Sequence, residues 1–211
     1  MEYDFLVNKE HPLERDYVPN HLVLYKGYNG PKIDNAHQTM IVDIVLKEFK
    51  EMQFDAQKEG YYLLLDSGYR SYEYQEKILE ENIRTKGADA YKYVAFPGTS
   101  EHQTGLALDL AIVNNYKTDY FNDEEYYAWM DNYCDSFDDT YPEIKWVHNN
   151  AWKYGFILRY PRGEERITGY NYECWHLRYV GREVSKYIYE NNISTLEEYH
   201  SIKKRKLTLL K

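Results

Sequence analysis

The sequence predicts an α+β fold, in which a small, mainly antiparallel sheet is flanked by helices. Segments with the 3.6-residue period of a helix are interspersed with short apolar runs, without the regular spacing of β-α-β units. The 211 residues suit a single domain, residues 1–211, with one sizeable core. A hydrophobic content of 43% and a charged content of 29% are typical of globular proteins.

The first half of the chain predicts an arm, two helices and a strand. Prolines and glycines interrupt residues 1–31, which indicates an extended N-terminal arm with one short strand pair. Asp34 is expected to cap a helix over residues 35–58, whose apolar face consists of Met40, Ile41, Ile44, Val45, Phe49 and Met52. The run 61–66 predicts a strand, and the turn 67–71 leads into a helix over 72–86, with a helical turn at 88–94.

Residues 106–113 predict a buried strand with two unlike faces. Alternation directs the leucines to one side and leaves Asp109 between two alanines on the other. Gly105 permits a backbone turn before this strand, so that His102 lies on a loop.

The second half begins with an acidic segment, residues 114–145, which we interpret as an insertion flanking a cleft. The later elements are expected to be a helix at 143–154 ended by Gly155, strands at 156–160 and 172–180, a turn region at 162–169, and helices at 182–191 and 195–203.

Charge and hydropathy exclude two classes of partner. The net charge of −9 argues against nucleic acid, and no stretch approaches the roughly 18 apolar residues of a membrane span. Residues 1–20 lack the apolar region of a signal peptide, so the chain as given is expected to be cytoplasmic. A signal or anchor removed before this numbering would instead make it extracellular or membrane-anchored.

His102 and Asp109 predict part of a metal site. A buried carboxylate needs a partner, since an unpaired buried charge costs several kcal/mol, and a zinc ion shared with His102 would satisfy it. Taken alone, the pair has a plainer interpretation. Asp109 would then cap or form a salt bridge, and His102 would be a surface residue.

Glu173 and His176 supply the second half of this site. His176 would complete the ligand set and Glu173 would be the base that accepts a proton from water. Residues three apart on a strand face opposite sides, so the chain must bend between them and regular strand begins only near Trp175. Cys174 is a rival ligand that ranks behind Asp109.

The combined motifs resemble the zinc D,D-carboxypeptidases of the VanY and VanXY type and related L,D-carboxypeptidases of bacterial cell-wall peptides. The motifs are Ser67-Gly68-Tyr69-Arg70-Ser71 with Gln75, then Ser100-x-His102-x-x-Gly105-x-Ala107-x-Asp109, then Glu173-x-Trp175-His176. The resemblance covers most of residues 5–200, while the long acidic segment departs from the compact VanXY members.

The resemblance implies a Zn²⁺ ion on His102, Asp109 and His176, in a cleft on the sheet, with Glu173 as general base. It implies that Arg70 stabilises the oxyanion, and that Arg70, Gln75 and Ser100 hold the peptide substrate. The implied activity is removal of a C-terminal D-alanine from peptidoglycan stem peptides or precursors, with D,D-dipeptidase activity also open.

Other functions remain open from the sequence. An L,D-carboxypeptidase acting on tetrapeptides, a cell-wall endopeptidase and a zinc-containing peptide-binding module each fit part of the pattern. The sequence does not choose between D-alanine, D-serine and D-lactate at the terminus.

Overall fold

A computed structural model of the chain describes residues 2–25, 39–92, 94–112 and 141–209. The strands are β1 (Leu22–Tyr25), β2 (Thr39–Val42), β3 (Leu63–Ser67), β4 (Ala107–Ile112), β5 (Phe156–Leu158) and β6 (His176–Tyr179). The α-helices are α1 (Asp43–Lys58), α2 (Tyr72–Lys86), α4 (Pro142–Asn150), α5 (Glu165–Thr168), α6 (Arg182–Glu190) and α7 (Leu196–Leu209). Short 3-10 helices are η1 (Gly87–Lys92), η2 (Glu101–Thr104) and η4 (Ala151–Tyr154).

The main sheet has four strands in the order β3-β4-β6-β5, and each neighbouring pair is antiparallel. A separate antiparallel pair joins β1 to β2. The predicted α+β class with a small antiparallel sheet is therefore confirmed.

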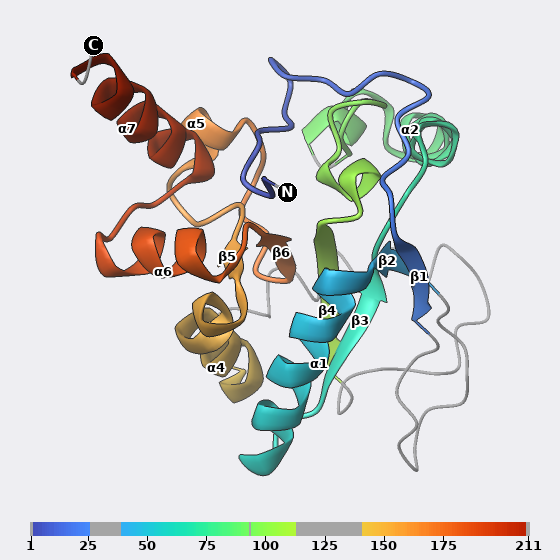
Figure 1. Ribbon diagram of the computed structural model, residues 1–211. Helices are drawn as coiled ribbons and strands as arrows, with labels where there is room; N and C mark the ends of the chain where they lie inside the picture. The colour runs from blue at the N-terminus through green and yellow to red at the C-terminus, as the bar shows by residue number, and fades with distance from the viewer. Residues whose placement is uncertain (1, 26–38, 93, 113–140, 210–211) are drawn as a thin grey trace.

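One face of the sheet carries the hydrophobic core. Leu108 and Leu110 of β4 pack in one buried cluster with Val45, Phe49 and Met52 of α1. Trp146 and Val147 of α4 belong to the same cluster. Figure 1 shows α1 lying across β3 and β4, and α4 and α6 grouped near β5. Side chains of α1 and α4 pack with the leucines of β4, so Asp109 faces away from the core.

The predicted helix over residues 35–58 is wrong at its beginning. Residues 39–42 form β2, which pairs with β1, and the helix starts only at Asp43. Helical spacing of Met40 and Ile41 with later apolar residues was misleading, because strand pairing with a distant segment buries Ile41 equally well. The predicted cap, Asp34, lies outside the described residues.

Other boundaries differ less. Helix α2 spans the predicted residues, whereas β5 is shorter and α7 longer than expected, and the turn region near residue 165 contains α5. The bend before β6 is confirmed, because the Glu173 carbonyl accepts a hydrogen bond from the His176 amide and the strand begins at His176. Most of the acidic segment 114–145 lies outside the described residues; its last residues begin α4.

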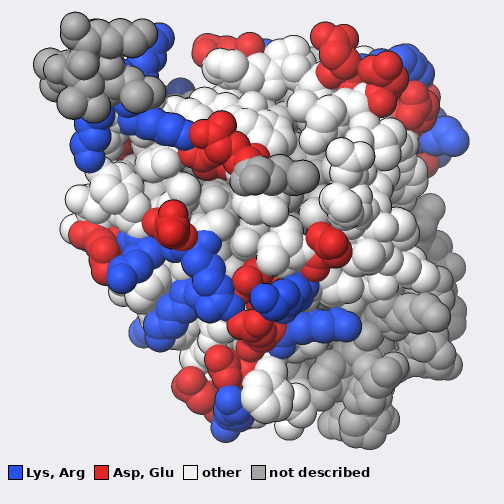
Figure 2. Space-filling view, viewed as in Figure 1, with Lys and Arg blue, Asp and Glu red and all other residues white. Residues whose placement is uncertain are grey.

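Basic and acidic side chains lie beside one another on the face drawn in Figure 2. Ion pairs between described residues include those of Arg182 with Glu48 and Glu51. Over the described ranges, no helix has both the length and the apolar character needed to cross a membrane.

Candidate metal centre

Asp109 occupies the middle of the sheet. On β4 it pairs with His176 of β6 on one side and with Ser67 of β3 on the other. Leu108 and Leu110 are buried in the core, so alternation sends the carboxylate to the opposite face, where the residue is 7% exposed. The register thus brings a carboxylate and an imidazole to the same place from strands far apart in sequence.

His102 reaches this carboxylate from η2. Its Nδ1 lies 2.6 Å from the Gly68 carbonyl oxygen, which can only accept, so Nδ1 carries the proton. The other nitrogen, Nε2, is then a lone-pair donor and lies 3.2 Å from Asp109 Oδ2. A backbone carbonyl that fixes the tautomer in this way is a common support of metal-binding histidines.

Gly105 makes this approach of η2 possible. It adopts the left-handed conformation with a φ of 64°, and a β-carbon there would lie 2.9 Å from Val42 Cγ2. Glycine is required between His102 and β4 for two reasons. The backbone angle is unfavourable for other residues, as predicted, and there is no space for a β-carbon.

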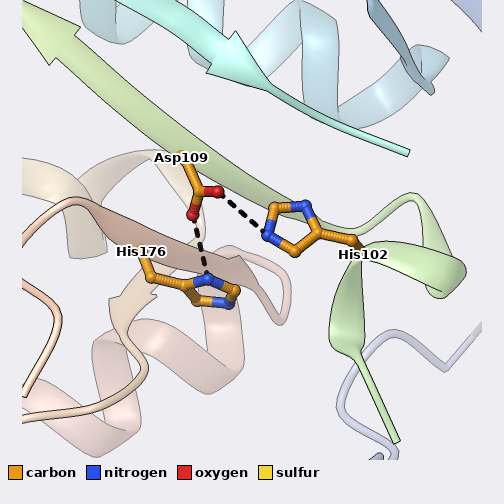
Figure 3. A group of neighbouring side chains, drawn as sticks. All are labelled: His102, Asp109 and His176. Carbon is orange, nitrogen blue, oxygen red and sulfur yellow. Dashed lines mark hydrogen bonds and ion pairs between the residues drawn. The ribbon is translucent and has the colours of Figure 1, made fainter. Parts of the chain in front are cut away.

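His176 is the third residue of the group formed with His102 and Asp109. Its Nδ1 lies 3.0 Å from Asp109 Oδ1, and its ring stands nearly perpendicular to that of His102, at 88°. Figure 3 shows the carboxylate between the two rings, with one oxygen directed to each. One donor atom from each residue lies within 4.8 Å of the others, and all three residues are buried.

These residues fit a divalent zinc ion. Two imidazole nitrogens and a carboxylate oxygen are a donor set typical of catalytic zinc, whose ligand atoms are about 3.4 Å apart at bond lengths of about 2.1 Å in a tetrahedron. Burial together with the positive charge of Arg70 lowers the pKa of His102, which favours the neutral form that binds metals. Burial opposes ionisation of Asp109, but the hydrogen bond from His176 and the positive charge of Arg70 hold its pKa well below the usual range.

His176 is surrounded by the carboxylates of Asp109, Glu101 and Glu173. Burial alone would lower its pKa, but the hydrogen bond with Asp109 and the nearby carboxylates of Glu101 and Glu173 outweigh that effect and raise its pKa to about 9. The protonated ring therefore supplies positive charge to the surrounding carboxylates. A divalent cation on Nδ1 would also bring positive charge to these carboxylates, so the electrostatics of the site suit a metal ion.

Arg70 lies at the edge of this group, where β3 leads into α2. Its Nη2 lies 2.7 Å from Asp109 Oδ2 and its Nε donates to Ser67 Oγ at 3.0 Å. The backbone amide of Arg70 also donates to the His102 carbonyl. The guanidinium is thus fixed beside the carboxylate while 22% of the side chain remains exposed.

Glu173 lies near the same nitrogen of His176 as Asp109 does. Its Oε2 is 3.6 Å from His176 Nδ1, and its amide donates to the Tyr160 carbonyl, which holds the bend before β6. Burial is the main cause that raises the pKa of Glu173, to about 7, and the negative charge of Asp109 contributes. A carboxylate with this pKa can both accept and release a proton near neutral pH.

Gln75 and Ser100, predicted to bind substrate, are both buried. Gln75 donates from Nε2 to the Ala95 carbonyl at 2.9 Å, and its Oε1 has no hydrogen-bond partner among the described residues. Ser100 precedes η2 and its carbonyl accepts from the Gln103 amide. These contacts position the loop that carries His102, and a substrate role for either residue stays a prediction.

Cys174, the rival ligand, is not part of the group. It is buried in a small cluster with Ile144, and its carbonyl accepts a hydrogen bond from His148 Nε2 at 2.9 Å. Cys134 lies outside the described residues.

Three charged residues behind His176 were missed by the sequence reasoning: Glu101, Arg159 and Arg178. Glu101 Oε1 accepts from Arg159 Nε and from Arg178 Nη1, each at 2.7 Å, and all three side chains are completely buried. A signal was present, because Arg178 follows His176 by two residues on β6 and therefore shares its side of the strand. The partner of these arginines could not be read from the sequence.

The chain is similar to known proteins in sequence and in fold. The VanY family model, described as D-alanyl-D-alanine carboxypeptidase, matches residues 38–182. The chain is 40% identical over 200 residues to YodJ of Bacillus subtilis (strain 168), covering 92% of this chain and 65% of YodJ. It is 35% identical over 196 residues to the bifunctional D-Ala-D-Ala dipeptidase and carboxypeptidase VanXYC of Enterococcus gallinarum, covering 92% of each.

Two solved structures extend the comparison to the fold. The LdcB LD-carboxypeptidase is 39% identical with a TM-score of 0.74, and the match covers 93% of this chain and 84% of LdcB. The D,D-pentapeptidase VanY from a VanB-type resistance cassette, solved with Zn(II), is 31% identical with a TM-score of 0.68, covering 93% and 98%.

The chain spans 59% to 66% of the length of the first three curated relatives. The family match nevertheless covers more than half of the sequence, including every residue of the candidate site. The chain therefore belongs to the VanY family of D-alanyl-D-alanine carboxypeptidases.

Proposed function

We propose that this protein is a zinc-dependent carboxypeptidase that removes a C-terminal D-alanine from peptidoglycan stem peptides or their precursors. The observation that carries the proposal is the buried group of His102, Asp109 and His176, whose donor atoms lie within 4.8 Å of one another, with Glu173 and Arg70 beside it. A structural metal site would need neither of these two residues. A zinc-containing peptide-binding module is therefore disfavoured.

The ligands would be His102 through Nε2, His176 through Nδ1 and Asp109 through a carboxylate oxygen. When bound there, zinc supplies Lewis acidity, which polarises a carbonyl and makes water acidic enough to act as a nucleophile near pH 7. The solved zinc complex of the related VanY supports the choice of metal.

Glu173 would move the proton. Its carboxylate accepts a proton from the attacking water, and the same proton then passes to the amine that leaves when the peptide bond breaks. The products are a peptide shortened by one residue and free D-alanine. The buried position of Glu173, with a pKa raised to about 7, suits both transfers.

Arg70 would stabilise the negative charge that develops on the carbonyl oxygen. Its contacts with Ser67 and Asp109 fix the guanidinium before substrate arrives, so little reorganisation is needed in the transition state. Part of its side chain is exposed, which leaves it accessible to a peptide.

An L,D-carboxypeptidase that removes D-alanine from tetrapeptides is the second candidate. The likeness to LdcB, at 39% identity, favours it, while the likeness to VanXYC and VanY favours the D,D activity. Both activities release D-alanine and use the same metal chemistry, so the choice concerns the residue before the scissile bond.

The test is a panel of synthetic stem peptides incubated with the zinc-loaded protein. Pentapeptide, tetrapeptide, the dipeptide D-Ala-D-Ala and a cross-linked muropeptide are analysed by mass spectrometry. Loss of one D-alanine from the pentapeptide supports D,D-carboxypeptidase activity, loss from the tetrapeptide supports L,D activity, and cleavage within the cross-link supports an endopeptidase. Absence of cleavage in every substrate would contradict the proposed function.

A further inference from the structure

Glu101 and His176 face each other behind the metal centre with unused polar atoms. His176 Nε2 lies 3.6 Å from Glu101 Oε2, and neither atom has a hydrogen-bond partner among the described residues. The distance is that of an ion pair and slightly exceeds a normal hydrogen bond. Buried polar atoms without partners are uncommon, and two that face each other indicate an interaction.

The other oxygen of Glu101 is already engaged. Oε1 accepts from both Arg159 and Arg178, so the carboxylate cannot turn away from His176 without giving up two charged hydrogen bonds. Since the Glu101 side chain is completely buried, water does not compete for Oε2.

The two arginines are themselves fixed by distant parts of the chain. Arg159 binds both carboxylate oxygens of Glu197 on α7, at 2.9 and 2.6 Å. Arg178 donates to the carbonyls of Tyr3 and Phe5 in the N-terminal arm. Both ends of the described chain therefore hold Glu101 in place.

We propose that Glu101 is a positioning residue of the metal centre, which keeps the proton of His176 on Nε2 and so keeps Nδ1 available as a metal ligand. A carboxylate beside Nε2 favours the proton on that nitrogen, as the Gly68 carbonyl does for Nδ1 of His102. The two histidines thus present opposite nitrogens to the metal, each selected by its own acceptor. The inference rests on the proposed function, because it requires the metal to bind at His176.

Glu101→Gln tests the proposal with almost no change of shape. The amide must direct its oxygen to the two guanidinium groups, since its NH₂ group would meet only donors there. The NH₂ group then faces His176 Nε2 and requires a lone pair, which moves the ring proton to Nδ1. We expect zinc affinity, measured by competition with a chelator, to fall by about 10- to 100-fold, as for other losses of a ligand's hydrogen-bond partner.

Glu197→Gln is the matched control. It makes the same chemical change in the same arginine network, but Glu197 contacts Arg159 and not His176. Zinc affinity should change far less than in Glu101→Gln. An equal loss in both variants would mean that the network acts only as structural support and would overturn the proposal, as would unchanged affinity in Glu101→Gln.

Nuclear magnetic resonance of the zinc-loaded wild-type protein tests the same point without relying on a folded variant. Two-bond ¹H–¹⁵N correlations should give the ¹⁵N shifts of a protonated Nε2 and a metal-bound Nδ1 in His176, and a one-bond correlation should show a slowly exchanging proton on Nε2. A proton on Nδ1, or rapid exchange at Nε2, would overturn the role of Glu101. If the wild-type protein binds no zinc, the proposed function itself fails, whereas a normal affinity that Glu101→Gln leaves intact removes only the positioning role.

Discussion

Replacing Glu173 by glutamine separates proton transfer from metal binding. The amide keeps the size of the side chain but cannot accept a proton from water. Glu173 Oε2 lies 3.6 Å from His176 Nδ1 and is not one of the three grouped donors, so the ligand set stays intact. We therefore expect Glu173→Gln to bind one zinc ion per chain, as the wild-type protein does.

The expected loss of activity is large. General acid–base catalysis contributes about 10²- to 10⁴-fold to a rate. This range corresponds to an increase of about 2.7–5.4 kcal/mol in the activation free energy. The fall should appear in kcat with little change in KM, because a base acts on the transition state rather than on bound substrate.

The pH dependence of kcat/KM provides a second test of Glu173 as the general base. The base must be ionised, so kcat/KM of the wild-type enzyme should rise with pH until Glu173 loses its proton. Burial raises the pKa of Glu173 to about 7, and the positive charge of zinc acts in the opposite direction, so this rise should lie at or below about pH 7. The residual activity of Glu173→Gln should lack this rise.

The assay is D-alanine release from a pentapeptide, with zinc content measured on the same samples. Glu190→Gln serves as control, because Glu190 is exposed on α6 and, among the residues that the structure describes, forms a surface ion pair with Lys186 alone. Activity of Glu173→Gln within tenfold of wild type would refute the assignment of the base. Loss of zinc from this variant would show instead that Glu173 is a ligand.

Three further predictions concern other parts of the site. Arg70→Ala should lower kcat by about 10²- to 10³-fold, as does loss of an oxyanion donor, and a change confined to KM would contradict that role. His176→Ala should lose zinc by elemental analysis, whereas a full equivalent of bound zinc would remove His176 from the ligand set. Gly105→Ala should lower the free energy of unfolding by more than about 1 kcal/mol, because φ is positive and Val42 Cγ2 lies 2.9 Å from the added carbon. Denaturant unfolding measures this change, and an unchanged midpoint would show that the turn adapts to the added carbon.

The sequence predicted the local features that depend on neighbouring residues. Alternation along residues 106–113 placed Asp109 opposite the core, and the geometry of a strand required the bend between Glu173 and His176. The first expectation holds because one face of β4 is covered by apolar side chains, which fixes the direction of every second residue. The second holds because β6 begins only at His176.

Features that depend on distant partners could not be predicted in the same way. The spacing of apolar residues predicts a helix that includes residues 39–42, and pairing with β1 makes them a strand instead. Glu101 stands next to His102 in sequence, yet it contacts the other histidine. Its environment is created by two arginines from β6 and the segment after β5, and no local pattern indicates that arrangement.

The most direct test of the account is a zinc titration of the metal-free protein in which bound zinc and D-alanine release are measured together. The account predicts that both rise in parallel and level off at one zinc ion per chain, and that His102→Ala, Asp109→Ala and His176→Ala each abolish the tight phase. Release of D-alanine by the metal-free protein, or an unaltered titration in these variants, would contradict the central claim.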